Sequence, residues 1–247
     1  MMKSISRLLI CVFALVALGR EGWAQSSAQF RPALLGNHKK SLINIIDTQG
    51  LMKRGQGDGF VMFGCAVSQY GSGYWSRTYR ASPNTELLQK EVLGRIDEAM
   101  FEPAIYKGSR APVYLTGSVV FAVRDGKPHL RIFLHQEEDE LKKGTDFVAP
   151  QWAFEAPGNP KFQGVFYPPS APGRAGVASL KLTVNESGHV QAASVVYEHP
   201  PGAGFGKEAL AIRDAAFIPG YRNGKMVSCS FLWTLIFTGP GRQMSTG

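Results

Sequence analysis

Histidines, an acidic run and a glycine-rich loop are the stretches of this chain whose residue types could carry chemistry. His129 and His135 have an even spacing that could place both side chains on one face of a strand. A metal site would need a third ligand at a defined spacing, and none is evident. The acidic run at residues 137–140 could bind a cation, but such runs are more often solvated. We therefore interpret all five histidines as surface residues: His38, His129, His135, His189 and His199.

The sequence at residues 202–206, Gly-Ala-Gly-Phe-Gly, resembles a phosphate-binding loop at the start of a helix. It follows two prolines, no β-α-β unit precedes it and no Lys-Ser/Thr pair follows, so phosphate binding is disfavoured. The sequence also shows no Gly-x-Ser-x-Gly motif, no Cys-His spacing and no carboxylate pair in distinct environments. We therefore predict a non-enzymatic protein with no cofactor and no metal ion.

The first residues are typical of a secretory signal peptide. Lys3 and Arg7 precede an apolar run at residues 8–18, and Gly22-Trp23-Ala24 supplies small residues for cleavage after Ala24. The apolar run is short for a membrane span. We expect a periplasmic protein that begins at Gln25, with an uncleaved inner-membrane anchor as the alternative.

Net charge gives a weaker indication of the partner. Removing the signal peptide leaves 24 basic and 18 acidic residues, a net charge of +6. This excess would favour anionic surfaces, although it also serves solubility and no dense basic patch appears. Nucleic acid is disfavoured by the export signal.

The order of elements is clearest at residues 204–238. An expected helix ends before the Phe-x-Pro motif at 217–219, because proline cannot continue a helix. Asn223-Gly224 is typical of a tight turn, and a strand is expected at 226–237. Its inward face alternates apolar residues: Val227, Cys229, Phe231, Trp233, Leu235 and Phe237. Its outward face carries Ser228, Ser230, Leu232 and Thr234.

The same order of elements occurs earlier in the chain, at a shift of 116 positions. The shift places three motif residues on three others: Phe101 on Phe217, Pro103 on Pro219 and Gly108 on Gly224. The apolar faces of the strands that follow also match in phase. A repeat of this length indicates that each copy is one folded unit.

Each copy reads β-β-α-β, so we expect an α+β protein in which each small antiparallel sheet carries one helix on a face. In the first copy, Ser82 and Pro83 mark the expected start of the helix. The predicted boundaries are a signal peptide at 1–24, an N-terminal leader at 25–58, a divergent first repeat with an extra strand at 59–136, a linker at 137–165, a second repeat at 166–239 and a tail at 240–247.

Two cysteines remain after export into an oxidising compartment, which favours a disulfide. Cys65 and Cys229 nevertheless lie on inward strand faces of different repeats. We expect two buried free thiols, with a disulfide as the alternative.

The second copy resembles the C-terminal domain of the TonB family, through an ordered set of motifs that are each weak alone. The set comprises Tyr167-Pro168, a strand at 177–184, Gly188-His189-Val190, Glu208-Ala209-Leu210, Phe217-Ile218-Pro219 and Asn223-Gly224-Lys225. The first copy resembles the domain more faintly, from about 59 to 123. The chain departs from the family at Ala215, where an aromatic residue is usual, and has no Pro-Lys/Glu-Pro spacer. The resemblance implies the fold and the binding of a protein or peptide, such as an outer-membrane or envelope protein, in envelope transport.

The expected docking site is the last strand, since an unpaired strand edge recruits another strand. Its outward residues Ser228, Ser230, Leu232 and Thr234 are uncharged and would not repel a partner. A competing interpretation is that the repeats cover each other's edges within one continuous sheet. Two other classes stay open: an energy-transducer component with an uncleaved anchor, and a small-ligand binding protein with a pocket between the repeats.

Overall fold

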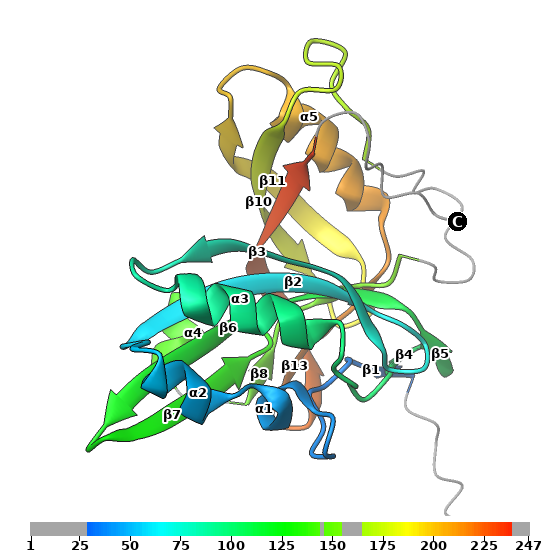
Figure 1. Cartoon of the computed structure of the whole chain (residues 1–247). Helices are drawn as coiled ribbons and strands as arrows, with labels where there is room; N and C mark the ends of the chain where they lie inside the picture. Colours follow the sequence, from blue (N-terminus) through cyan, green and yellow to red (C-terminus); the bar gives the residue numbers. More distant parts are fainter. Residues whose placement is uncertain (1–28, 144–145, 155–164, 239–247) are drawn as a thin grey trace, which may run out of the picture.

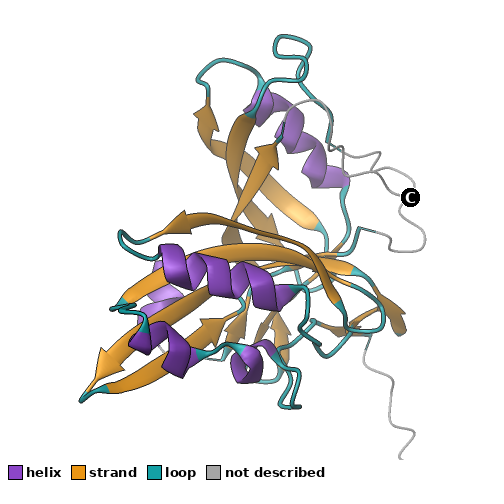
Figure 2. Cartoon of the chain, in the orientation of Figure 1, coloured by secondary structure: helices purple, strands orange, loops and turns teal. Residues whose placement is uncertain are grey.

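The computed structural model describes residues 29–143, 146–154 and 165–238, and these form an α+β structure of mostly antiparallel sheets. Strands dominate over helices (Figure 2). The expected signal peptide at 1–24 and tail at 240–247 lie outside the described residues. Within the described part, no helix combines the length and the hydropathy that crossing a membrane would require.

The first unit is built on a sheet with the strand order β12-β9-β6-β2-β3, and β7 pairs with β6 beside that path. Figure 1 labels β2, β3, β6 and β7 of this sheet. The strands of this sheet are β2 (Gly59–Val67), β3 (Gly73–Ala81), β6 (Val113–Arg124), β7 (Lys127–Phe133), β9 (Gln151–Trp152) and β12 (Phe217–Ile218), of which β12 is contributed by the second unit. Helix α3 (Glu86–Ile96) covers one face and buries Leu88, Val92 and Ile96. These positions recur every four residues, so one stripe of the helix faces the sheet.

The N-terminal leader belongs to this first unit. Strand β1 (Phe30–Arg31) and helices α1 (Leu42–Ile45) and α2 (Thr48–Lys53) precede β2. Leu42 and Leu51 are fully buried in the same core cluster as α3. The leader therefore extends the first core instead of preceding it.

The second unit is a three-stranded sheet with the order β11-β10-β15. Its strands are β10 (Gly176–Val184), β11 (Val190–His199) and β15 (Cys229–Phe237). A short helix α5 (Phe205–Ala209) continues as a 3₁₀ turn η1 (Leu210–Asp214) on one face. The two sheets share a local strand order, β3-β2-β6 and β11-β10-β15, in which the central strand pairs with the next long strand on one side and with a later one on the other.

Each unit also has a small hairpin directly before one of its long strands, β6 in the first unit and β15 in the second. Strands β4 (Ala104–Tyr106) and β5 (Ser109–Ala111) pair in the first unit, and β13 (Gly220–Arg222) and β14 (Lys225–Val227) in the second. Their registers coincide at the shift of 116, because Ala104 pairs with Ala111 and Gly220 with Val227. Both turns have two successive positive φ angles, at Lys107-Gly108 and Asn223-Gly224, as a two-residue hairpin loop requires.

The backbone of the phenylalanine in each Phe-x-Pro motif contacts a hairpin turn, the β2–β3 turn in the first unit and the β10–β11 turn in the second. The Phe101 N–H donates to the Gly71 carbonyl at 2.8 Å, and the Phe217 N–H donates to the Gly188 carbonyl at 3.0 Å. Gly71 has a φ of 94° and Gly188 a φ of 79°, and a Cβ at either position would collide with the phenylalanine carbonyl oxygen. Glycine is therefore required at both turns.

The helix positions differ from the sequence predictions. Helix α3 begins at Glu86 after Thr85, so the prediction of Ser82 as N-cap and Pro83 as first helical residue is wrong. The Ser82 hydroxyl instead accepts a hydrogen bond from the Phe60 N–H, which engages it with the neighbouring strand. In the second unit only five residues are α-helical before the chain tightens into η1.

The last strand is interrupted where a single strand at 226–237 was predicted. Strand β14 ends at Val227 and β15 begins at Cys229, so Ser228 belongs to neither. The break arises because β14 pairs with β13 whereas β15 pairs with β10, which requires the chain to change sheets at Ser228.

The predicted linker at 137–165 contains regular structure in its described part. It forms helix α4 (Glu138–Lys143) and strands β8 (Phe147–Val148) and β9. Strand β8 pairs with β13, and β9 pairs with both β6 and β12. Because β6 belongs to the first unit and β12 and β13 to the second, this segment joins the two units through backbone hydrogen bonds.

Candidate functional site

Strand β15 is the terminal strand of the second sheet among the described residues. It pairs with β10 over nine consecutive positions without a register shift. Of the predicted docking residues, Ser230, Leu232 and Thr234 lie on β15, and Ser228 lies just before it. The strand therefore presents one straight, regular edge that pairs with no other strand in the described part of the chain.

One hydrogen bond shows which backbone groups face away from the sheet. The Leu232 N–H donates to the Glu137 Oε1 at 2.7 Å, so it points away from β10. Backbone groups alternate sides along an antiparallel strand. The outward groups of β15 are therefore those of Ser230, Leu232, Thr234 and Ile236.

The hydroxyl groups of Ser230 and Thr234 form hydrogen bonds to side chains of the neighbouring strand β10. The Thr183 and Ser230 hydroxyls are 2.8 Å apart, and those of Ser179 and Thr234 are 3.0 Å apart, across the β10–β15 pair. Leu232 is 40% exposed. The edge therefore offers a partner its backbone N–H and C=O groups more than its hydroxyls.

Two other long edge strands, β11 and β3, are irregular, whereas β7 pairs with β6 over seven positions without a register shift and pairs with no other strand in the described chain. Strand β11 has two register shifts against β10, and β3 has two against β2. In β11 the Ala193 carbonyl, which faces away from β10, accepts a hydrogen bond from Arg213 at 3.2 Å. Bulges twist an edge away from new pairing, so β15 is a better candidate than β11 or β3. Its nine regular pairs also make it a longer edge than β7, which has seven.

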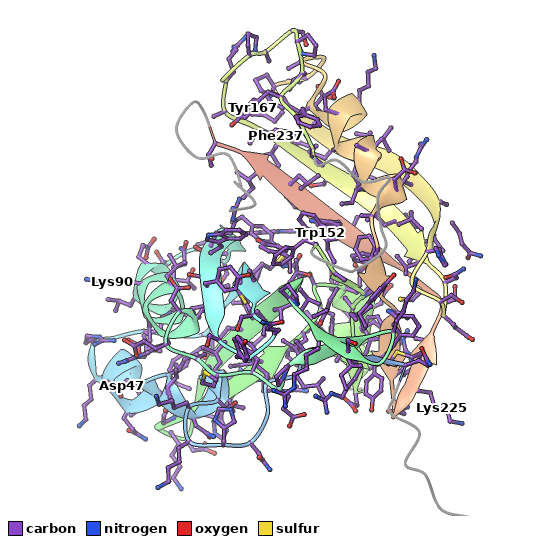
Figure 3. The ribbon with its side chains drawn as sticks, turned by 90° about the vertical axis from the view of Figure 1, so that its right-hand side faces the viewer. Asp47, Lys90, Trp152, Tyr167, Lys225 and Phe237 are labelled. Carbon is purple, nitrogen blue, oxygen red and sulfur yellow. The ribbon has the colours of Figure 1, made fainter. Side chains whose placement is uncertain are left out.

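The first unit approaches the edge of β15 through aromatic residues. The Trp152 and Trp233 ring centroids are 5.6 Å apart, and Figure 3 shows Trp152 where the two units meet. A hollow of about 20 Å³ separates Arg77, Tyr114 and Trp152 from residues 233–236 of β15. Such a volume holds about one water molecule. A docking strand would therefore have to displace side chains on this part of the edge.

The chain segment 135–140 touches both units. The carbonyl of His135 accepts a hydrogen bond from the Ser118 hydroxyl at 3.0 Å, and the Gln136 amide donates to the Gly117 carbonyl at 3.2 Å. Glu137 reaches Leu232, and Glu140 pairs with Arg222 of β13 at 2.9 Å. The hydrogen bond from Arg222 lowers the pKa of Glu140 to about 2, and Lys143 contributes in the same direction.

Sequence reasoning missed this role of the acidic run. A run of four acidic residues reads as solvated, and only the fold brings Glu137 to a residue 95 positions later. Glu138 and Lys142 do behave as a solvated pair, with side chains 81% and 67% exposed. The distinguishing signal is absent from local sequence because it depends on the contact between units.

The interpretation of every histidine as a surface residue is wrong for His135. This residue is fully buried between the Phe133 and Phe147 rings, with both centroid distances 5.4 Å. Neither ring nitrogen has a hydrogen-bond partner in the described structure. Burial lowers the pKa of His135 to about 4; Glu140 opposes this shift and Arg222 adds to it. Strand β8 covers the residue, and a two-residue strand leaves no periodic pattern in the sequence.

The backbone of the glycine-rich loop at 202–206 binds a carboxylate side chain of the same protein. The N–H groups of Gly204 and Gly206 donate to the Glu198 carboxylate at 2.6 and 3.2 Å. A phosphate would have to displace this carboxylate. The loop is thus a structural cap for α5.

The cysteines and possible metal ligands add no chemistry to the edge. Cys65 and Cys229 are free thiols, as expected, although Cys229 is only partly buried. Burial raises the pKa of Cys229 to about 11, and it raises the pKa of Cys65 further still. Within residues 29–143, 146–154 and 165–238, no three His, Cys, Asp or Glu side chains gather as metal ligands would.

Comparison with known proteins leaves the family open. No family model, no curated protein and no solved structure matches the chain. The resemblance to the TonB C-terminal domain therefore stays a prediction.

Proposed function

We propose that this protein is a non-enzymatic, periplasmic binding protein that captures an extended protein or peptide segment on the outer edge of β15. The observation that carries the proposal is the straight, unpaired edge, with nine regular pairs to β10 on its other side. Strand addition to such an edge derives affinity from backbone hydrogen bonds. The TonB-like motif order, with its implied role in envelope transport, supports the same style of binding.

We further propose that the chain is a duplication of one β-β-α-β unit of the TonB C-terminal type. Support comes from the shared strand order, the coincident hairpin registers and the matching contacts of Phe101 and Phe217. The duplication supplies an internal comparison, because β6 and β15 are equivalent strands. The outer edge of β6 is already occupied by β7 and β9, whereas that of β15 is not paired in the described chain.

Strand β7 indicates what kind of segment fits. It pairs antiparallel to β6 from Lys127 to Phe133. Its side chains alternate between the partly buried Leu130 and Ile132 and the exposed His129 and Arg131. A partner for β15 would be a strand of similar length with apolar residues at alternate positions.

Replacing Ser230 with proline tests the edge. Proline has no N–H to donate, and the N–H of Ser230 faces away from β10, so the sheet should remain intact while docking is lost. A synthetic peptide of the β7 sequence, residues 127–133, serves as the probe in an NMR titration of the purified protein. We expect shifts along β15 in the wild type and none in Ser230→Pro.

The matched control is Ala193→Pro, which removes an outward N–H from the other edge of the same sheet. This variant should bind the peptide as the wild type does. The proposal is contradicted if Ser230→Pro binds equally well, or if the peptide shifts β11 instead of β15. Unfolding of Ser230→Pro, seen as loss of dispersion in its spectrum, would mean that the strand is already paired on both sides.

The rival functions draw less support from the geometry. The hollow between the units, about 20 Å³, is far below the several hundred Å³ that small-ligand sites have. A larger depression of about 340 Å³ lies beside α3 and is lined by charged residues such as Lys90 and Arg95. It belongs to the first unit alone, so it is not the pocket between the repeats that the small-ligand alternative requires. The energy-transducer alternative depends on an uncleaved anchor.

Processing of the N-terminus decides between the soluble and anchored alternatives. We expect cleavage after Ala24, because a charged start, a short apolar run and Gly22-Trp23-Ala24 precede it. Mass spectrometry of the exported protein should give a chain that begins at Gln25. An intact Met1 in the membrane fraction would favour the transducer instead.

A further inference from the structure

We infer that the Glu137 carboxylate is a removable cap on the docking edge of β15, and that an incoming strand must displace it to bind. This inference rests on the proposed function and adds a control on the same site. It begins from the single hydrogen bond between the Leu232 N–H and the Glu137 Oε1 at 2.7 Å.

The position of this bond is central to the edge. Leu232 lies midway along β15, between the outward groups of Ser230 and Thr234. An added antiparallel strand would bring a backbone carbonyl to the Leu232 N–H. The Glu137 oxygen therefore stands where a partner's carbonyl oxygen would stand, and the two cannot be present together.

The setting of Glu137 allows it to leave. Its neighbour Gln136 is anchored to the first sheet through the carbonyls of Phe63 and Gly117. Glu140, three residues later, is anchored to Arg222. The side chain of Glu137 can thus swing away from Leu232 while both flanking anchors remain in place.

A charged side chain on an edge is also a known means of preventing unwanted pairing. A free edge as regular as β15 would otherwise attract the same edge of a second copy. A weakly pairing strand would not compensate for the loss of the hydrogen bond between Glu137 and Leu232. A strand that forms several backbone hydrogen bonds with β15 would compensate for it and displace the carboxylate.

The experiment compares wild type, Glu137→Ala and Glu138→Ala in titrations with the β7 peptide, residues 127–133. Glu138 is the control because it lies next in sequence, is exposed and pairs only with Lys142 in the described structure. Removing a charged competitor for one backbone N–H should tighten peptide binding by about tenfold in Glu137→Ala. Glu138→Ala should bind as the wild type does.

Hydrogen exchange supplies a second readout that needs no peptide. The Leu232 amide should exchange faster in Glu137→Ala than in the wild type, while inward amides such as those of Phe231 and Trp233 keep their rates. Unchanged inward rates also show that the variant is folded.

The outcomes separate the cap from the docking function. If the wild type binds the peptide and Glu137→Ala binds no tighter, the cap is refuted and the docking edge stands. If the Leu232 amide exchanges equally fast in both proteins, the cap is also refuted. If none of the three proteins binds the peptide, the proposed function fails and the cap fails with it.

Discussion

Replacing Phe217 with alanine is expected to destabilise the protein by about 3–5 kcal/mol, the range for emptying a buried aromatic site. The Phe217 side chain is 1% exposed, and its ring packs against Phe231 and Trp233 at centroid distances of 6.0 and 5.2 Å. Its neighbour Ile218 points into the core of the first unit instead. The substitution therefore opens a cavity where the two cores meet, and urea denaturation should measure the loss.

Phe166→Ala is the matched control, because the same atoms are removed from a side chain that is 60% exposed. Its effect should stay within about 0.5 kcal/mol, as for ordinary surface substitutions. Phe101→Ala should resemble Phe217→Ala, since Phe101 is 2% exposed and makes the equivalent contact with a glycine turn. A loss below about 1 kcal/mol for Phe217→Ala would contradict its role in the core.

Stability is expected to fall between pH 6.5 and pH 4 because of His135. The pKa of this residue is about 4 in the folded protein and 6.5 when unperturbed. The unfolded chain therefore binds a proton that the folded protein excludes over this range. The stabilisation is complete above pH 6.5 and is lost progressively as the pH falls towards 4. The two values imply a total of about 3 kcal/mol.

His135→Leu isolates this contribution. Leucine keeps an apolar volume between Phe133 and Phe147, removes two unpaired nitrogens and does not titrate. Denaturation midpoints measured from pH 4 to 7 should show a shallower decline in the variant than in the wild type. The exposed His129 provides the control, and His129→Leu should keep the wild-type slope.

The ionisable groups that face His135 do not produce a loss of stability in the same pH range. Glu140 and Arg222 face the imidazole, and the lowered pKa of Glu140, about 2, places its loss of stabilisation below its ordinary value of 4.5. The window from 6.5 to 4.5 thus belongs to the histidine. An identical pH slope in His135→Leu and the wild type would show that His135 titrates freely.

The candidate site could be predicted from the sequence only in part. The alternation along β15 predicted a strand with Phe231 and Trp233 inward, and both are buried. The direction of the backbone N–H groups depends on which strand lies beside β15, and sequence patterns do not contain that information. Glu137, the residue in contact with the edge, was assigned to a solvated run for the same reason.

Local rules by themselves indicated the long strands and the tight turns of this protein. Side-chain alternation is a property of the extended chain, and a positive φ at Asn223-Gly224 or Lys107-Gly108 is a property of those residues. These features do not depend on a distant partner, so they can be predicted from the sequence. The correspondence of motifs at a shift of 116 positions can be recognised for the same reason.

Tertiary structure alone decided how the two units are joined. Strands β8, β9 and β12 have two residues each, too few for a period to appear, and they exist because partners from other parts of the chain pair with them. The burial of His135 follows from the position of β8, and the break at Ser228 follows from the change of partner between β14 and β15. Contacts between units remove groups from water regardless of local pattern, and that is why the sequence could not show them.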